Sequence, residues 1–430
     1  MTDAREVPVD PESFQRLAAQ DLTYRLIDNA SDADTEAFLR ADARGFLDAD
    51  PAADVVAADR AGVVDRRNVG VFDDRAPDGT WPVATVNSWL TPLTVPGGEI
   101  DMWAISSVTV SGTHRRRGIA RALLEGELRA AASAGVAIAG LTVSEATIYG
   151  RYGFASAIPV ARLTVDTRRA GWAAASPAGR LEYVDKETLK AEIARLHEIE
   201  RTRRSGQIAG WDRRWDRVAG LAAGHPTPAA VRGVRYIDEH GDVQGVMSYR
   251  LSEITGAFRF EMHITQMAAV TTDAQTALWG FALQHDLVDK VSADLRPIDD
   301  PLPWLVNDRR GIEAVVHDHG WLRILDVPAA LTARTYRAPL DVVLRVDDPL
   351  GFATGDWRIV VDGGRAEAAP AVDADPDAVL DIGALSAIYA GGVSAVQLRA
   401  AGRIRAALET AAALDDAFRS AEAPVLGIWY

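Results

Sequence analysis

The sequence predicts a mixed α/β protein with two similar domains in tandem, the second a degenerate copy of the first, followed by a smaller third α/β domain. Residues 106–130 read as a strand, a glycine-bearing cationic turn and an amphipathic helix, and residues 267–286 repeat this plan. The pattern then changes near residues 317–322. A chain of 430 residues is expected to hold about three domains. We place them at residues 1–160, 161–320 and 321–430.

Composition and charge exclude several classes of function. The chain has no cysteine, which rules out a thiol nucleophile, a thiolate metal site and a disulfide framework. The formal net charge of −15 argues against general binding to nucleic acid or to anionic membranes, and it favours a cationic substrate. The histidines show no HxH or HExxH spacing, so no metal site is expected. The polar, acidic start, and apolar runs far shorter than the roughly 20 residues that span a bilayer, favour a cytoplasmic protein.

The first domain is expected to begin with a polar lead-in over residues 1–20 and a strand over residues 22–27. A helix is predicted over residues 33–47, with Ala37, Phe38, Ala41 and Phe46 on its buried side. Strands are predicted at residues 67–72, 82–93 and 100–110, with turn signals at residues 76–79 and 96–98. After residues 106–130, we expect a strand at residues 136–143, a short connecting segment at 144–154 and a last strand at 161–165.

The central turn carries the main functional signal. Val108 and Val110 alternate with polar residues as in a strand, and a helical pattern begins at Ile119. Between them, residues 112–118 read GTHRRRG. Such a turn can hold phosphate, because a helix start offers unpaired N–H groups and a glycine lets a ligand approach the backbone. The arginines could also form a solvated face, whereas a nucleic-acid surface would need a broader basic patch.

The second domain repeats this order without the arginines. It is predicted to contain a helix at residues 186–201, strands at 234–238, 245–251 and 258–270, and a helix at 273–285. Arginines and tryptophans between residues 203 and 217 are interpreted as a solvated helical hairpin rather than a nucleic-acid surface. The second turn supplies Thr272 and Asp273, and an acid at this position would repel phosphate. We therefore expect this copy to pack rather than to bind a phosphate ligand.

The third domain differs in pattern and ends on an apolar tail. Helices are predicted at residues 327–336, 377–389, 393–404 and 408–418, with strands at residues 340–346 and 357–362. Residues 424–430 read PVLGIWY, whereas chain ends are usually polar and frayed. This tail is expected to be buried or held in a cleft.

These residues carry a family resemblance. Arg115-x-x-Gly118-x-Ala120, at a strand-to-helix turn, resembles the acyl-CoA signature of the GNAT acetyltransferases. The chain is also similar to the Eis family, actinobacterial GNAT N-acetyltransferases, at residues 113–118, 144–145, 148–151, 300–303 and 327–331 and in its aromatic C-terminus. The resemblance implies a functional GNAT domain, a GNAT-like domain without CoA and a sterol-carrier-like domain, assembled as a homohexamer from two trimers. It implies acetyl-CoA as cosubstrate and a small-molecule amine, aminoglycosides included, as acceptor.

The resemblance also implies residue roles. By position, Tyr149 matches a general acid, and the free carboxylate of Tyr430 matches a base. Val108 and Val110 match the strand that holds the acetyl-pantetheine arm, and Asp48 matches an acid of the substrate pocket. The other cofactor-binding candidates are Thr109, Arg115, Arg116, Arg117, Gly118, Ile119, Ala120, Ser144 and Glu145. Trp429 is a substrate-binding candidate; it stands where some relatives have an acid, which weighs against an aminoglycoside preference but leaves a cation–π contact.

Acetyl transfer from a thioester to an amine defines what the site must do. The N–H groups of residues 115–120 can anchor the cosubstrate, and the N–H of Val108 is the candidate donor to the carbonyl oxygen. An ordinary α-carboxyl pKa is about 3.3–3.7, so the Tyr430 base needs burial or a second group. Tyr149, with an ordinary pKa of about 10, keeps a proton for the departing thiolate. Two alternatives stay open: an apolar-ligand or lipid carrier with vestigial GNAT domains, and a protein lysine acetyltransferase.

Overall fold

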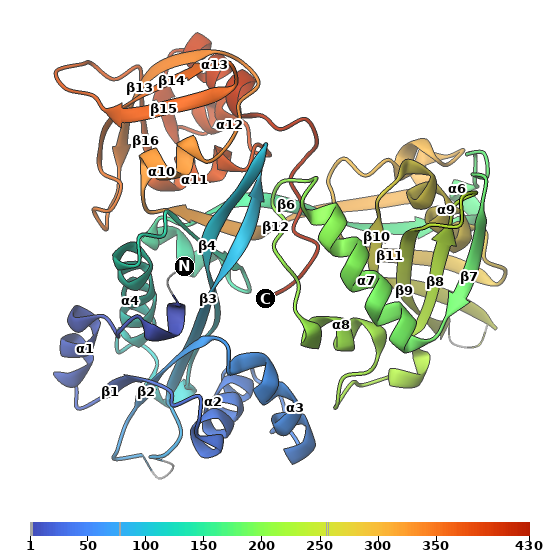
Figure 1. The fold of residues 1–430 in the computed structure, drawn as a ribbon, viewed down its shortest axis with the longest axis horizontal. Helices are drawn as coiled ribbons and strands as arrows, with labels where there is room; N and C mark the ends of the chain where they lie inside the picture. The colour runs from blue at the N-terminus through green and yellow to red at the C-terminus, as the bar shows by residue number, and fades with distance from the viewer. Residues whose placement is uncertain (1–2, 77–78, 255, 257) are drawn as a thin grey trace. The chain divides into compact units, whose positions relative to one another are not determined.

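The computed structural model describes residues 3–76, 79–254, 256 and 258–430 (Figure 1). Part of the turn expected at residues 76–79, Pro77 and Asp78, lies outside the described residues. The chain folds into two compact units. The first unit comprises Met1–Ala157, Gly320–Ser420 and Tyr430, and the second comprises Ile158–His319 and Ala421–Trp429. In the described part of the chain, no helix has the length and apolar character needed to cross a bilayer.

The first unit contains a mixed sheet with strand order β1-β2-β3-β4-β5-β12. The strands are β1 (Thr23–Leu26), β2 (Arg67–Phe72), β3 (Ala84–Val95), β4 (Gly98–Val110), β5 (Ile138–Thr142) and β12 (Ile312–Ile324), which belongs to this unit from Gly320 onward. β4 and β5 are parallel, and the other neighbours are antiparallel. Five of the six strands expected in this domain are therefore present in this unit, in the predicted order. The last, expected at residues 161–165, is instead part of β6 (Ala155–Asp166), which belongs to the second unit from Ile158 onward, and β12 takes the place next to β5.

Helices α2 (Asp32–Gly45) and α4 (Ile119–Ser133) cover opposite faces of this sheet (Figure 1). Thr109 of β4 lies against Gly45 of α2. A Cβ added at Gly45 would come within 2.3 Å of the Thr109 side chain, so only glycine fits there. Val108 and Val110 alternate with Thr109 and pack against the core beneath α4. The predicted buried side of α2 is confirmed for Ala37, Phe38 and Ala41. Phe46 is the exception: α2 ends at Gly45, and Phe46 is 47% exposed.

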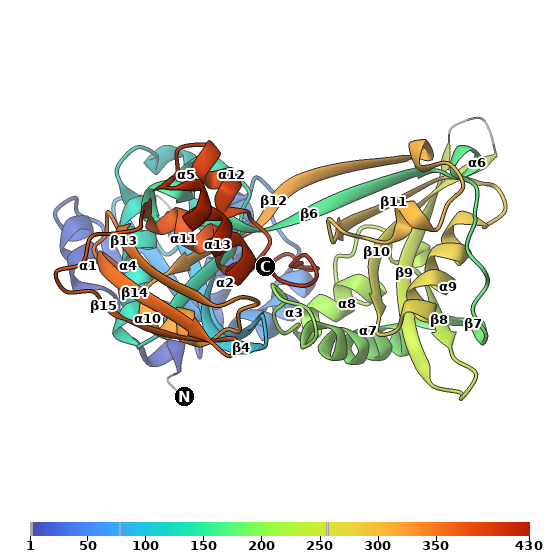
Figure 2. The same cartoon turned by 90° about the horizontal axis from the view of Figure 1, so that it is seen from above.

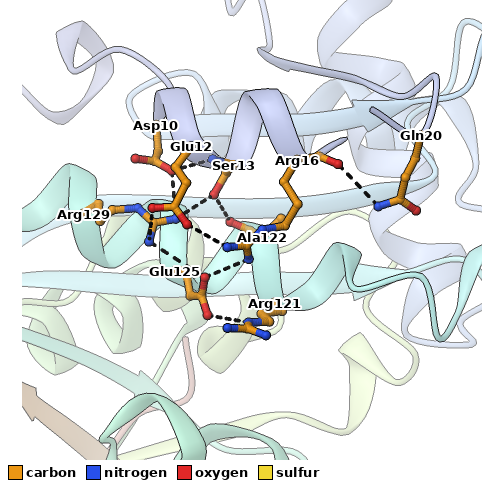
Figure 3. Close-up of polar contacts among 9 residues, drawn as sticks. All are labelled: Asp10, Glu12, Ser13, Arg16, Gln20, Arg121, Ala122, Glu125 and Arg129. Carbon is orange, nitrogen blue, oxygen red and sulfur yellow. Dashed lines mark hydrogen bonds and ion pairs between the residues drawn. The ribbon is translucent and has the colours of Figure 1, made fainter. Parts of the chain in front are cut away.

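The polar lead-in expected over residues 1–20 is in fact partly helical, as α1 (Pro11–Ala18). Asp10 caps this helix by accepting from Ser13 N at 2.7 Å, and Pro11 occupies its first turn. α1 packs on α4 through polar contacts (Figure 3). Ser13 Oγ donates to the Ala122 carbonyl at 2.7 Å, and Arg16 pairs with Glu125 at 2.8 Å. In a sequence, polar residues that contact another helix cannot be distinguished from polar residues that face solvent. For this reason the sequence pattern did not predict α1.

A buried ion pair lies at the centre of this domain. Arg67 of β2 and Glu127 of α4 have fully buried side chains and approach to 3.2 Å. Glu127 also accepts hydrogen bonds from Ser88 Oγ at 2.5 Å and from Trp103 Nε1 at 3.2 Å. Buried charges of this kind are tolerated only when they are paired and hydrogen-bonded, so this network fixes α4 on the sheet. Helix α3 (Ala53–Val63), which the sequence pattern did not indicate, packs against α2.

The third domain belongs to the first unit and has its own sheet, with strand order β15-β14-β13-β16-β17. Its strands are β13 (Leu340–Asp347), β14 (Gly355–Asp362), β15 (Arg365–Pro370), β16 (Ala378–Asp381) and β17 (Ile404–Ala406). Its helices are α10 (Val327–Thr332), α11 (Ile382–Tyr389), α12 (Ala395–Ala400) and α13 (Leu408–Phe418); α11 and α13 pack on β13 (Figure 2).

Two helix predictions in this domain are corrected. Residues 377–389 contain strand β16 before α11 begins, because β16 pairs in parallel with β13. Residues 393–404 end in β17, which pairs with β16. Long-range pairing overrides local helix propensity at both places. The change of pattern near residues 317–322 falls inside the continuous strand β12.

The second unit has the strand order β6-β11-β10-β9-β8-β7. Its strands are β6 (Ala155–Asp166), β7 (Arg180–Val184), β8 (Arg232–Ile237), β9 (Val243–Ile254), β10 (Arg259–Ala269) and β11 (Val288–Arg296); its main helices are α7 (Lys186–Arg201), α8 (Asp212–Ala219) and α9 (Thr272–Leu283). β10, α9 and β11 reproduce the plan of β4, α4 and β5, including the parallel pairing of the two strands. The sequence pattern missed β7 and β11.

The C-terminal tail is held inside the second unit. Val425 N donates to the Ser205 carbonyl at 3.0 Å, and Gly427 N donates to Gln207 Oε1 at 3.0 Å. The Ile428 carbonyl lies 2.9 Å from His319 Nε2. Val425, Leu426 and Ile428 are buried, as expected for this tail, whereas Trp429 is 46% exposed.

Candidate active site

The two central parallel strands of the first unit separate partway along their length. β4 and β5 pair from Met102↔Ile138 to Ala104↔Gly140, and the described pairing stops there although both strands continue. On its other side, β4 carries a bulge opposite β3, where the pairing shifts register between Thr85 and Asn87. Ser107 lies in this bulge with φ of +54°. After Ala104, the backbone of β4 therefore no longer pairs with β5. These residues lie in the last part of β4, just before the turn at residues 112–118.

The turn after β4 has the backbone of an anion site. Gly118 is the N-cap of α4 with φ of +75°, and no side chain in the described ranges caps the helix. A Cβ at Gly118 would meet no described atom within 4 Å, so the left-handed backbone, rather than space, requires glycine. Arg116 also has a positive φ, of +63°. The first N–H groups of a 15-residue helix therefore face an open approach.

The three predicted arginines are not equivalent. Arg117 donates to the Gln20 carbonyl at 3.2 Å, and its own carbonyl accepts from Gln20 Nε2 at 3.2 Å. Asp73 lies 3.8 Å from Arg117 and 3.2 Å from His114; its hydrogen bonds with Arg75 and His114 hold the pKa of that carboxyl well below its usual range.

The side chains of Arg115 and Arg116 are exposed and make no ion pair or hydrogen bond with the described residues. Two guanidinium groups are therefore available to a ligand, and the third holds the turn in place. Arg115 also borders a cavity of about 780 Å³, together with Val110, Trp81 and Arg44.

Tyr149 is the last residue of α5 (Ala146–Tyr149), which follows β5. Its ring is buried and meets Phe154 edge-on, with 6.2 Å between the ring centres. Burial raises the pKa of its hydroxyl, which makes no hydrogen bond with the described residues. Ser144 and Glu145 are exposed just before this helix, and Glu145 accepts from Thr147 Oγ1 at 3.0 Å.

Tyr430 lies along β5 where it separates from β4. Thr142 Oγ1 donates to the terminal oxygen of Tyr430 at 2.5 Å. Its ring meets Trp89 of β3 edge-on at 5.4 Å, and a Cβ at Gly140 would come within 3.2 Å of its hydroxyl oxygen. The chain end therefore lies within the first unit, on the strand that borders the split.

Three other predicted residues lie differently. Thr109 Oγ1 bonds Thr85 Oγ1 at 2.6 Å on the side of α2, which leaves only its backbone for a ligand. Asp48 is exposed in the loop after α2. Trp429 packs edge-on against His319 of the second unit, with 4.4 Å between ring centres.

Sequence reasoning missed Asp42. It lies on α2, four residues after the buried Phe38 and three before Gly45, so the helical period already puts it on the buried face. Burial raises the pKa of the Asp42 carboxyl to about 7. The Ser107 side chain and the charge of Arg66 act in the opposite direction and lower this pKa, but burial outweighs them. Burial also lowers the pKa of Arg66 to about 10. An acid on the apolar stripe of a helix was the signal that could have found it.

Comparisons with known proteins agree with this architecture. Sequence models of acetyltransferase (GNAT) domains match residues 26–157 and 206–324, and a model of the sterol carrier protein domain matches residues 327–427. An uncharacterized N-acetyltransferase of Streptomyces avermitilis is 35% identical over 78% of this chain and 82% of its own. N-acetyltransferase Eis of Mycobacterium tuberculosis is 34% identical over 73% of this chain and 77% of its own. The crystal structure of Eis1 from Mycobacterium abscessus superposes with a TM-score of 0.79 at 28% identity, covering 95% of this chain and all of that one.

Proposed function

Because the chain belongs to the Eis-like family of GNAT N-acetyltransferases, we propose that it transfers the acetyl group of acetyl-CoA to primary amines of cationic small molecules. Acetyl-CoA is the cosubstrate that GNAT domains imply. The proposed acceptors are aminoglycoside-like or polyamine-like, and the net charge of −15 favours them. The observation that carries the proposal is the start of α4, which lies at the split of two parallel strands. Among the described residues, no side chain caps it, and the neighbouring Arg115 and Arg116 make no ion pair or hydrogen bond.

The turn supports binding of the pyrophosphate of CoA. The N–H groups of residues 115–120 are proposed to donate to phosphate oxygens, with Arg115 and Arg116 adding charge-assisted hydrogen bonds. Arg117 acts indirectly, since its contacts with Gln20 fix the turn. The second domain offers Thr271 and Asp273 at the start of α9, where an acidic first turn disfavours phosphate.

The chemical groups are assigned along the split. The backbone N–H of Val108, beside the bulge, is proposed to stabilise the carbonyl oxygen of the thioester as it gains charge. Tyr149 is proposed to protonate the departing thiolate, and burial keeps its hydroxyl protonated through the neutral range. The carboxylate of Tyr430 is proposed to accept a proton from the attacking ammonium. Asp48 is proposed to attract the ammonium to the site. The amine attacks directly, with no covalent enzyme intermediate.

Acetyl transfer is tested by the release of free CoA thiol from acetyl-CoA over a panel of polyamines, aminoglycosides and lysine peptides. Thiol release that rises with a small cationic amine supports the proposal. Release with lysine peptides alone would instead indicate a protein lysine acetyltransferase. No release with any amine, together with a lipid co-purifying with residues 321–430, would favour the alternative of an apolar-ligand carrier. The family also leads us to propose a homohexamer of two trimers, which analytical ultracentrifugation would test.

The role of the Tyr430 carboxylate leads to a prediction about the chain end. Adding two glycines after Tyr430 moves the carboxylate away from Thr142 and leaves a neutral amide in its place. We expect kcat to fall by about 10²-fold, with acetyl-CoA affinity unchanged, because general-base catalysis typically contributes at least this much. Steady-state kinetics and CoA titration measure the two quantities. The matched control is two glycines added before Met1, and full activity with the extended C-terminus would contradict the role.

A further inference from the structure

An acid with an unusual setting lies under the bulge of β4. Asp42 Oδ1 is buried and accepts no hydrogen bond from the described residues. A buried carboxylate oxygen without a donor is costly, so such a group either holds a proton itself or receives one from a ligand. Neither the anchoring of the cosubstrate nor the proposed roles of Tyr149 and Tyr430 uses this carboxylate.

Ser107 connects Asp42 to the reacting centre. The side chain of Ser107 is close enough to Asp42 to lower the pKa of its carboxyl, and the Ser107 hydroxyl accepts from Asn87 Nδ2 at 3.2 Å. A hydroxyl has one proton to donate and two lone pairs to accept with, so a bond from Asn87 leaves the Ser107 proton for Asp42 and one lone pair for a further donor. Ser107 is half-buried and directly precedes Val108, whose N–H is the proposed oxyanion donor.

The charges that face Asp42 come from the ends of neighbouring elements. Asp48, beyond the end of α2, raises its pKa, and Arg66, which directly precedes β2, lowers it. Arg66 lies over the Trp89 ring at 3.7 Å, on the same side chain that Tyr430 contacts. The strands packed on α2 contribute the neutral groups of Asn87 and Ser107. α3 places Arg60 in an ion pair with Asp32, at the other end of α2.

We propose that Asp42, reached through the hydroxyl of Ser107, is a second proton acceptor for the acceptor ammonium. This rests on the proposed acetyl transfer. An ammonium must lose two protons to become an acetamide: one before it can attack and one from the nitrogen after the N–C bond forms. The first passes to the Tyr430 carboxylate, as proposed above, and the freed amine attacks. The second passes to Ser107 Oγ while the Ser107 proton moves to Asp42, as the C–S bond breaks and Tyr149 protonates the thiolate. Solvent then takes one proton, and the other returns to Tyr149.

The direct test is the pH dependence of kcat/KM in wild type and Asp42→Asn. The carboxyl must be ionised to accept a proton, so wild-type kcat/KM should fall as the pH drops below about 7. Asp42→Asn should lower kcat/KM about 10²-fold at pH 8 and remove this limb. Ser107→Ala should lower the rate similarly, because it breaks the relay while keeping Asp42. Asp34→Asn, an equal change on the same helix at a residue paired with Arg25, should leave the profile as in wild type.

A second measurement needs no activity. The folded protein holds the Asp42 proton more tightly than the unfolded chain, where the pKa is about 3.9, so this residue costs stability as the pH rises from about 4 to about 7. The melting temperature of Asp42→Asn relative to wild type should therefore be higher at pH 8 than at pH 5.

The outcomes separate the two proposals. If wild type acetylates no amine, the proposed function fails, whatever the melting curves show. If wild type is active and Asp42→Asn keeps the same acid limb and rate, the relay is overturned. A melting difference that does not change between pH 5 and pH 8 would also overturn it, because Asp42 would not titrate in this range.

Discussion

Tyr149→Phe should lower kcat about 10²-fold while leaving the affinity for acetyl-CoA unchanged. The phenyl ring keeps the packing against Phe154, so only the proton donor is lost. The effect lies at the low end for acid catalysis because a thiolate, with a pKa of about 8.5 for a simple thiol, leaves readily. Pre-steady-state thiol release and equilibrium titration with CoA measure the two quantities. Burial raises the Tyr149 pKa above its ordinary value, so wild-type kcat should show no loss of this acid in the neutral range.

Tyr152→Phe provides the matched control for this substitution. Tyr152 lies in the same turn, is equally buried and also has a pKa raised by burial. Its backbone carbonyl, which is unaffected by the change, accepts from Arg323 at 2.8 Å. We expect near wild-type turnover. Equal losses in both variants would mean that any hydroxyl removed from this turn perturbs the site, and the assignment of Tyr149 as acid would not stand.

The part of the site that the sequence predicted is the part built from local pattern. A strand, a glycine turn and a helix follow one another within residues 106–130, and short-range rules describe each of them. The same rules identified the second copy, because its β10 and α9 keep the periodicity while its turn has Asp273 in place of arginines. Gly118 is the clearest case: the pattern predicts a glycine at the start of the helix, and the structure has it as the N-cap of α4. The reason for glycine differs from the predicted one, because the left-handed backbone rather than a close approach requires it.

The part that was missed depends on residues far apart in the chain. In the sequence, Arg117 is indistinguishable from Arg115 and Arg116. Its different role comes from a hydrogen bond to the carbonyl of Gln20, 97 residues earlier in the chain. Asp42 looked like any polar helical residue, because its environment is set by Ser107 and Arg66 on other elements. β16 lies in a stretch with a helical pattern, and pairing with β13 makes it a strand. Such contacts leave no periodic trace in a single sequence.

Arg323 is another residue whose role depends on long-range contacts. It connects the third domain to the turn that carries Tyr149. Its guanidinium donates to the Tyr152 carbonyl at 2.8 Å and to Asp348 Oδ1 at 2.6 Å, and both charged side chains are fully buried. A Cβ at Gly153 would come within 2.5 Å of Arg323 Nε, so glycine lets the turn approach this closely. The carboxylate of Asp348, in the third domain, thereby balances the charge of the Arg323 guanidinium beneath this turn.

Asp348→Ala should therefore destabilise the first unit by about 3–5 kcal/mol, because it leaves Arg323 as an uncompensated buried charge. Asp348 also accepts from Leu350 N and Ala353 N, and these donors lose their partner too. Chemical denaturation followed by tryptophan fluorescence measures the loss. Asp341→Ala is the control, because its pair with Arg358 is more than half exposed and is worth at most about 1 kcal/mol. Equal midpoints for the two variants would contradict the buried-charge account, whereas recovery in Arg323→Met/Asp348→Ala would support it, since replacing both charges removes the desolvation cost that one alone leaves.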